Sequence, residues 1–173
     1  MAMPPRLRRV ALTAHVTSSV GWLGAVACSL ALAVAGLTSQ DPQTVRAAFL
    51  ILKLLGWSVL VPLSLASLLT GLIQALASPW GLLRHYWVVF KLLINIGAST
   101  VLLLYMETFG ELAAVAREPD ADLGTVRSVS PVLHATLAVL LLLIATGLAV
   151  YKPRGITPYG RSKQRGPGAV LSP

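Results

Sequence analysis

Four long apolar runs constrain what this chain can fold into more than any other feature. The runs cover residues 10–37, 47–77, 86–106 and 132–151. Inside them the only formal charges are those of Lys53 and Lys91. A helix needs about 20 residues to cross roughly 30 Å of hydrocarbon, and every run reaches that length. Buried helices of soluble proteins are usually shorter and keep a charged face. The runs therefore predict an all-α integral membrane four-helix bundle, formed by residues 1–152.

The composition agrees with lipid as the main solvent of this chain. Hydrophobic residues make up 55% of its 173 residues and charged residues 12%, whereas soluble domains carry roughly 25% charged residues. The net charge is +8, but the basic residues form no face interleaved with aromatics. We therefore expect the lipid bilayer, and not nucleic acid, as their partner. The single cysteine, Cys28, excludes an intramolecular disulfide and a zinc site built on thiolate pairs.

The basic residues are distributed unevenly between the two ends of the predicted bundle. Nine lie before the first run, between the second and third, or after the fourth: Arg6, Arg8, Arg9, Arg84, Lys152, Arg154, Arg161, Lys163 and Arg165. All six acidic residues lie on the opposite side. Because cytoplasmic loops are enriched in Lys and Arg, we expect both termini in the cytoplasm and residues 107–130 outside. The basic tail, residues 153–173, is rich in Gly and Pro and is predicted to be disordered near the inner leaflet.

Polar residues of the third run form one intramembrane stripe. Trp87, Lys91, Asn95 and Ser99 recur every fourth residue, and Trp22 of the first run is grouped with them. Lys91 lies about two turns from the nearer border, so it either serves a site or extends its side chain back to the interface. Asn95 lies too deep for that, and we expect it to hydrogen-bond another helix. The stripe predicts that Lys91 and Asn95 face the interior of the bundle, near His15.

The three histidines divide between the two halves of the membrane. His15 and His85 both fall in the cytoplasmic half, so this pair could bind a haem between facing helices, whereas His134 lies on the other side. The candidate cofactor-binding residues are therefore His15, His85 and Lys91, with b-haem as the candidate cofactor. The alternative is that each histidine makes an ordinary polar contact within the bundle or at its border.

Sequence signatures of catalysis are absent. The chain contains no phosphate-binding loop, no Gly-x-Ser-x-Gly, no His-Glu-x-x-His and no Cys-x-x-Cys. No carboxylate lies within an apolar run, which argues against a proton pump that uses buried acids. We therefore predict no catalytic residue and no metal site.

Three segments carry a resemblance to known proteins. "HVTSSVGWLGAVACSLALAVAGL", "SPWGLLRHYWVVFKLL" and "YKPRGITPYGR" resemble a family of bacterial predicted integral membrane proteins, a domain of unknown function. The resemblance implies four spans and a location in the bacterial plasma membrane. More distantly, His15, Trp22, Gly24, Trp87 and Lys91 are similar to the four-helix clan of copper-resistance D-type proteins and haem-associated protoporphyrinogen oxidase. That similarity implies a haem or metal-handling site near His15 and Lys91.

Three functions are compatible with these features. The first is a non-enzymatic subunit or accessory of a membrane assembly, which contacts a membrane protein partner or a second copy of the chain. An alternative is a b-haem or metal-binding redox protein. A further alternative is a small solute or ion carrier with a polar path along His15, Asn95 and Lys91.

Overall fold

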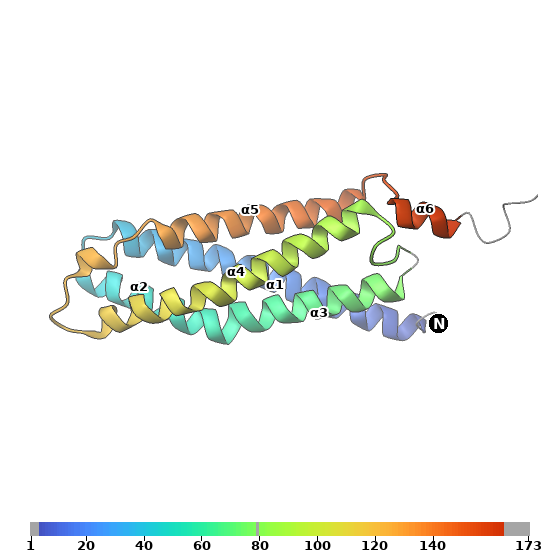
Figure 1. The fold of residues 1–173 in the computed structure, drawn as a ribbon. Helices are drawn as coiled ribbons and strands as arrows, with labels where there is room; N and C mark the ends of the chain where they lie inside the picture. The colour runs from blue at the N-terminus through green and yellow to red at the C-terminus, as the bar shows by residue number, and fades with distance from the viewer. Residues whose placement is uncertain (1–3, 79, 165–173) are drawn as a thin grey trace, which may run out of the picture.

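The computed structural model describes residues 4–78 and 80–164, and this part of the chain is almost entirely helical (Figure 1). The elements are α1 (Pro5–Thr38), α2 (Pro42–Leu55), the π-helical turn η1 (Gly56–Leu60), α3 (Val61–Ala77), α4 (Tyr86–Arg117), the 3-10 turn η2 (Leu123–Thr125), α5 (Ser130–Tyr151) and α6 (Pro158–Gln164). Four helical segments are long and apolar enough to cross a membrane, namely Pro5–Thr38, Pro42–Ala77, Tyr86–Arg117 and Leu123–Tyr151. The all-α prediction and its four candidate spans are confirmed.

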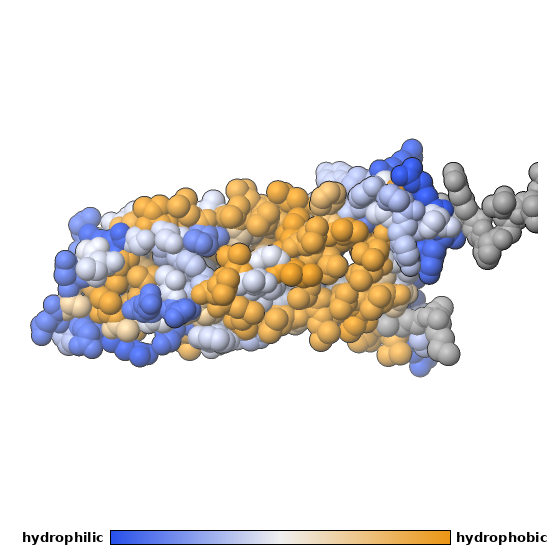
Figure 2. Space-filling view, viewed as in Figure 1, coloured by the Kyte–Doolittle hydropathy of each residue, from blue (hydrophilic) through white to orange (hydrophobic). Residues whose placement is uncertain are grey.

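The four spans form a ring in chain order. The first span, α1, packs against the second (α2 and α3) and the fourth (α5), and α4 packs against the same two neighbours. Short connections explain this order, because they leave consecutive helices antiparallel and adjacent. Both ends of the described chain lie at one end of the bundle, which we call the terminal end, and the opposite end is the distal end (Figure 1). Figure 2 shows an apolar band between two hydrophilic ends.

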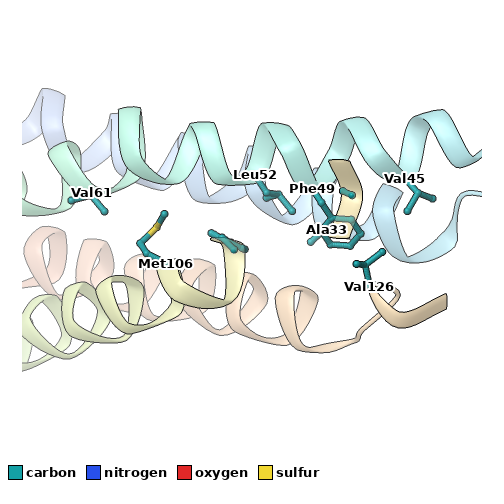
Figure 3. Packing of buried hydrophobic residues seen from close by; sticks show 9 residues of the cluster. Ala33, Val45, Phe49, Leu52, Val61, Met106 and Val126 are labelled. Carbon is teal, nitrogen blue, oxygen red and sulfur yellow. The ribbon is translucent and has the colours of Figure 1, made fainter. Parts of the chain in front are cut away.

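The distal half of the bundle is closed by a packed apolar core. Figure 3 shows this cluster, which consists of Ala33, Val45, Phe49, Leu52, Val61, Met106, Phe109, Ala116 and Val126. Gly36 of α1 permits the close contact, since a Cβ atom there would lie 3.1 Å from the Phe49 ring. Small residues allow helices to approach closely, and in a membrane such packing replaces the hydrophobic effect as the force that joins them.

The second span is interrupted just before Pro62. The sequence predicts a kink there, because proline cannot donate a backbone hydrogen bond and clashes with the preceding turn. The structure places the π-helical turn η1 at this point, with the Val61 N–H donating to the Gly56 carbonyl. Such a turn accommodates an interruption of the regular hydrogen-bond pattern. The lack of a side chain at Gly56, the first residue of this turn, also lets α4 approach, since a Cβ atom there would lie 2.6 Å from Cε of Met106.

The third span is longer than the sequence predicts. The sequence predicts an outer loop over residues 107–130 with a short surface helix around residues 110–117, but α4 continues without a break from the span to Arg117. The physical reason is packing, because Phe109, Ala113 and Ala116 recur at helical spacing and are buried on a helix that packs against α2. The loop begins only at Glu118, which ends the helix in an extended conformation.

Side chains cap several helix ends at the distal end. Asp41 accepts hydrogen bonds from the hydroxyl and amide of Thr44 and the amide of Gln43, at the start of α2. These bonds, with the Thr44 hydroxyl first, hold the pKa of Asp41 below its usual value. Arg46 donates to the carbonyls of Ala116, Glu118 and Pro119, which lie at and just beyond the end of α4. Arg127 donates to the Ser39 carbonyl, 2.7 Å away, at the end of α1.

We expect Arg46→Ala to destabilise the bundle by about 1–2 kcal/mol, because a charged donor is lost from three carbonyls that have no helical partner. The matched control is Arg117→Ala, which removes an exposed arginine from the last turn of α4, the helix whose end Arg46 contacts, and should cost no more than about 0.5 kcal/mol. The measurement is the free energy of unfolding in mixed micelles titrated with dodecyl sulfate. Equal losses in both variants would show that Arg46 acts only through its charge.

The described part of the basic tail differs from the disorder that the sequence predicts. Between 153 and 164 the chain packs on the link between α3 and α4 and then forms α6. The Thr157 hydroxyl donates to the Leu83 carbonyl at 2.6 Å, and the Thr157 amide donates to the Arg84 carbonyl at 3.0 Å. The link presents backbone carbonyls to which the tail can donate hydrogen bonds, and the composition of the tail alone does not reveal this. The rest of the predicted tail, residues 165–173, lies outside the described residues.

Candidate functional site

A cavity of about 620 Å³ occupies the terminal half of the bundle, and all four spans line it. We call it the terminal cavity. Its polar lining includes His15 and Trp22 from α1, Trp87, Lys91 and Asn95 from α4, and Lys152 just after α5. The walls between these groups are mostly Ala, Leu and Val side chains. A concave, largely apolar space with a few convergent polar groups is the usual form of a small-molecule site.

The structure therefore brings together most of the predicted polar stripe. Trp22, Trp87, Lys91 and Asn95 all line the terminal cavity, and His15 of α1 lines it as well. Ser99 is buried but is not a lining residue, and its hydroxyl has no partner among the described residues. The 3.6-residue helical period explains why four positions so spaced share one face.

His15 is fixed by hydrogen bonds from α3. Its Nδ1 lies 3.1 Å from the Ser67 carbonyl and 3.1 Å from the Thr70 hydroxyl. A carbonyl only accepts, so Nδ1 donates to Ser67, and in the neutral ring Nε2 then keeps its lone pair. No described residue hydrogen-bonds Nε2. The ring also packs closely against the backbone of α3, since a Cβ atom on Gly71 would lie 2.9 Å from Cε1 of His15.

Lys91 is half-buried on the cavity wall and has no carboxylate near it. Its Nζ lies 5.9 Å from the centre of the Trp87 ring, one turn closer to the terminal end. All six acidic residues lie in the distal part of the bundle, from Asp41 in the α1–α2 connection to Asp122 in the α4–α5 loop. Because its Nζ reaches the Trp87 ring, the Lys91 side chain extends toward the terminal end, as a snorkelling lysine does. It lines the candidate site at the same time.

Two buried polar atoms, one on α1 and one on α4, have no hydrogen-bond partner among the described residues. The side chain of Asn95 donates from Nδ2 to the Lys91 carbonyl of its own helix at 3.2 Å, and its Oδ1 is unpaired. This corrects the expectation that Asn95 bonds another helix. Nε1 of Trp22, whose side chain is 2% exposed, is also unpaired. Such unpaired groups are uncommon and costly, and neither atom exposes surface that a molecule in the cavity could reach.

The structure does not bring the other histidines into this site. His85 precedes the first turn of α4, where Nδ1 lies 2.8 Å from the Trp80 carbonyl and the ring packs edge-on against Trp80. It does not line the terminal cavity. At the distal end His134 stacks on Tyr105, with 4.3 Å between ring centres. It lines a separate apolar cavity of about 120 Å³. The predicted pairing of His15 with His85 across one haem therefore has no support in this geometry.

Sequence reasoning missed the residues at the mouth of the terminal cavity. Arg8, Trp80 and Lys152 line this end. Lys152 has a left-handed backbone with φ of 44°, which turns the chain back after α5, and its Nζ lies 5.9 Å from the Trp80 ring centre. In the sequence, Arg8 and Lys152 bear only on the predicted orientation of the bundle. The one signal in the sequence was the tryptophan at position 80, which precedes Gly81 between the second and third apolar runs.

Metal-ligating side chains do not gather elsewhere in the described ranges. Across residues 4–78 and 80–164, no three His, Cys, Asp or Glu side chains lie close enough to hold a metal ion. Cys28 is exposed on α1, in the apolar band. The terminal cavity is therefore the candidate site that the geometry supports best.

Comparison of the chain with protein-family models, with curated proteins and with solved structures finds no match. The resemblance to bacterial integral membrane proteins, and the more distant one to the haem-associated clan, therefore stay predictions.

Proposed function

We propose that this chain is a non-enzymatic, multi-pass protein of the bacterial plasma membrane that holds an amphiphilic small molecule in the terminal cavity. The observation that carries the proposal is the convergence of His15, Lys91 and Asn95, from two helices, on one space of about 620 Å³. This volume falls within the range of ordinary ligand sites. The enrichment of basic residues at the terminal end supports an orientation with that end in the cytoplasm.

A binding site is better supported than a transport path. The distal half is filled by large apolar side chains, among them Phe49, Leu52, Met106 and Phe109. Trp22 lines both the terminal cavity and the small distal cavity and is nearly fully buried, so a solute that entered from the terminal end would have to displace it before it met this core. The carrier hypothesis would require the core to open, and an accessory role for the protein would require only that the ligand binds.

A cavity-filling substitution tests this proposal. Ala149 and Ala135 both lie on α5, but Ala149 lines the terminal cavity and Ala135 lines the distal one. We expect native mass spectrometry of the wild-type protein, released from lipid nanodiscs, to show a bound small molecule. Ala149→Phe should abolish the adduct and Ala135→Phe should retain it. The proposal fails if the wild-type protein carries no adduct or if both variants carry it equally.

A second candidate, b-haem, is favoured by one specific observation, the tautomer of His15. An axial histidine usually donates its second ring N–H to a carbonyl or carboxylate, and His15 donates Nδ1–H to Ser67. Nε2 of His15 would hold the iron and Lys91, when neutral, would supply a second nitrogen, since both line the terminal cavity, whereas His85 would take no part. Bound haem would supply one-electron redox chemistry at this position.

The haem candidate makes a spectroscopic prediction. If haem binds at His15, protein purified from haem-replete cells will show a Soret band and, after reduction with dithionite, a sharp α-band. His15→Ala should remove both bands, whereas the control His134→Ala, at the other end of the bundle, should keep them. A featureless spectrum from folded wild-type protein would exclude haem and leave the amphiphile proposal in place.

A further inference from the structure

The terminal cavity carries positive charge that no acidic side chain of the described residues neutralises. Lys91 lies in its wall, and Arg8 and Lys152 lie at its exposed end. None of the six acidic side chains of the chain is at this end of the bundle. From this imbalance we infer that the ligand is an anionic amphiphile, whose carboxylate or phosphate contacts Lys91 and whose chain lies along the apolar walls. The inference rests on the proposed function and specifies the class of its ligand.

The position of Lys91 is the first support for this class. A charged group inside the hydrocarbon region is costly unless it reaches a polar partner. The contact that the structure shows for its Nζ is the face of Trp87, 5.9 Å away, which is a weak partner compared with an anion. Because the amine is half-buried in a cavity wall, an anion that enters the cavity can reach it.

The shape and polarity of the cavity are the second support. The charged groups Arg8 and Lys152 mark the opening, and most of the remaining lining is apolar. A molecule with one charged head and an apolar body matches this distribution.

Two sources could supply this chemistry. A free carboxylate with an alkyl chain and the phosphate head group of a membrane lipid both present an anion on an apolar body. The two are distinguished by probes that share the chain and differ in the head group.

The tryptophans of the chain provide the readout. Trp22, Trp80 and Trp87 line the terminal cavity, whereas Trp57 does not and is 55% exposed on the second span. A Trp57→Phe background therefore leaves only cavity tryptophans to report. Brominated chains quench tryptophan fluorescence on contact. The probes are dibromostearate, its uncharged methyl ester, and phosphatidic acid and phosphatidylcholine that carry the same brominated chain.

In neutral detergent we expect saturable quenching by an anionic probe at a concentration about tenfold lower than its uncharged or zwitterionic counterpart requires. Lys91→Gln should raise the half-saturating concentration of the anionic probe about tenfold. Lys91→Arg, which keeps the charge, should retain tight binding. The matched control is Lys53→Gln, since Lys53 is also half-buried within a span but lines neither cavity.

The outcomes separate the inference from the proposed function. Tight binding of dibromostearate alone assigns a free carboxylate, and tight binding of phosphatidic acid alone assigns a lipid head group; both support the anionic class. Equal binding of the acid and its methyl ester, or no effect of Lys91→Gln in folded protein, overturns the inference while a ligand-binding cavity remains. The absence of saturable quenching by all four probes overturns the proposed function itself.

Discussion

Replacing Phe49 with alanine is expected to lower the free energy of unfolding by about 3 kcal/mol, the low end of the range for burial-dependent Phe→Ala changes. The side chain is 1% exposed, and a Cβ atom on Gly36 would lie 3.1 Å from its ring. Figure 3 shows it beside Ala33 and Val126, so its removal leaves a void between three segments of the chain. We choose the low end because lipid solvates the separated helices, and only the packing contribution is then lost.

The matched control is Ile51→Ala, two residues away on the same helix. Ile51 is 46% exposed on the lipid-facing side, so lipid chains fill the space that its side chain vacates. We expect a change within about 0.5 kcal/mol. Both variants are compared by dodecyl sulfate titration in mixed micelles. Similar losses at the two positions would mean that the distal half is not a packed core, and a path through the bundle would become the better hypothesis.

The spans could be predicted from the sequence because hydrocarbon thickness sets their minimum length directly. Their ends could not. The extension of α4 to Arg117 depends on the burial of Phe109, Ala113 and Ala116 beside α2, and no local signal distinguishes a packed helix from a surface one. In the same way, the tail around Thr157 looks disordered by composition, yet its backbone pairs with the Leu83–Arg84 link.

The candidate site could be predicted in part for a similar reason. Helical periodicity places Lys91 and Asn95 on one face regardless of the fold, and both line the terminal cavity. His85 was predicted to join them from its depth alone, but its position just before α4 directs it to the Trp80 carbonyl. The role of Lys152 depends on a left-handed turn after α5, which the residue type does not favour and which sequence therefore does not reveal.

Gly160→Ala is expected to release α6 from the terminal end. A Cβ atom on Gly160 would lie 2.5 Å from the Arg84 carbonyl oxygen and 2.7 Å from Cγ2 of Ile156. The first is a backbone atom that cannot rotate away, so the helix itself must shift. The bonds from Thr157 to Leu83 and Arg84, at 2.6 and 3.0 Å, should then weaken. In hydrogen-exchange mass spectrometry, we expect peptides across residues 155–162 to exchange about tenfold faster, equivalent to ~1.4 kcal/mol of lost protection.

Ser162→Ala is the control for this release, because it alters α6 at an exposed position and introduces no new atom toward the link. It should leave the exchange rates within about twofold of wild type. Slow exchange in both variants would show that α6 tolerates the extra methyl group and that its contact with the link is looser than the distances imply.

Release of the helix has a consequence for the site, since Lys152 at the cavity mouth is joined to α6 by only five residues, 153–157. The Gly160→Ala variant should therefore bind the anionic probe more weakly than wild type if the docked tail holds Lys152 in place, and with unchanged affinity if Lys91 alone determines binding.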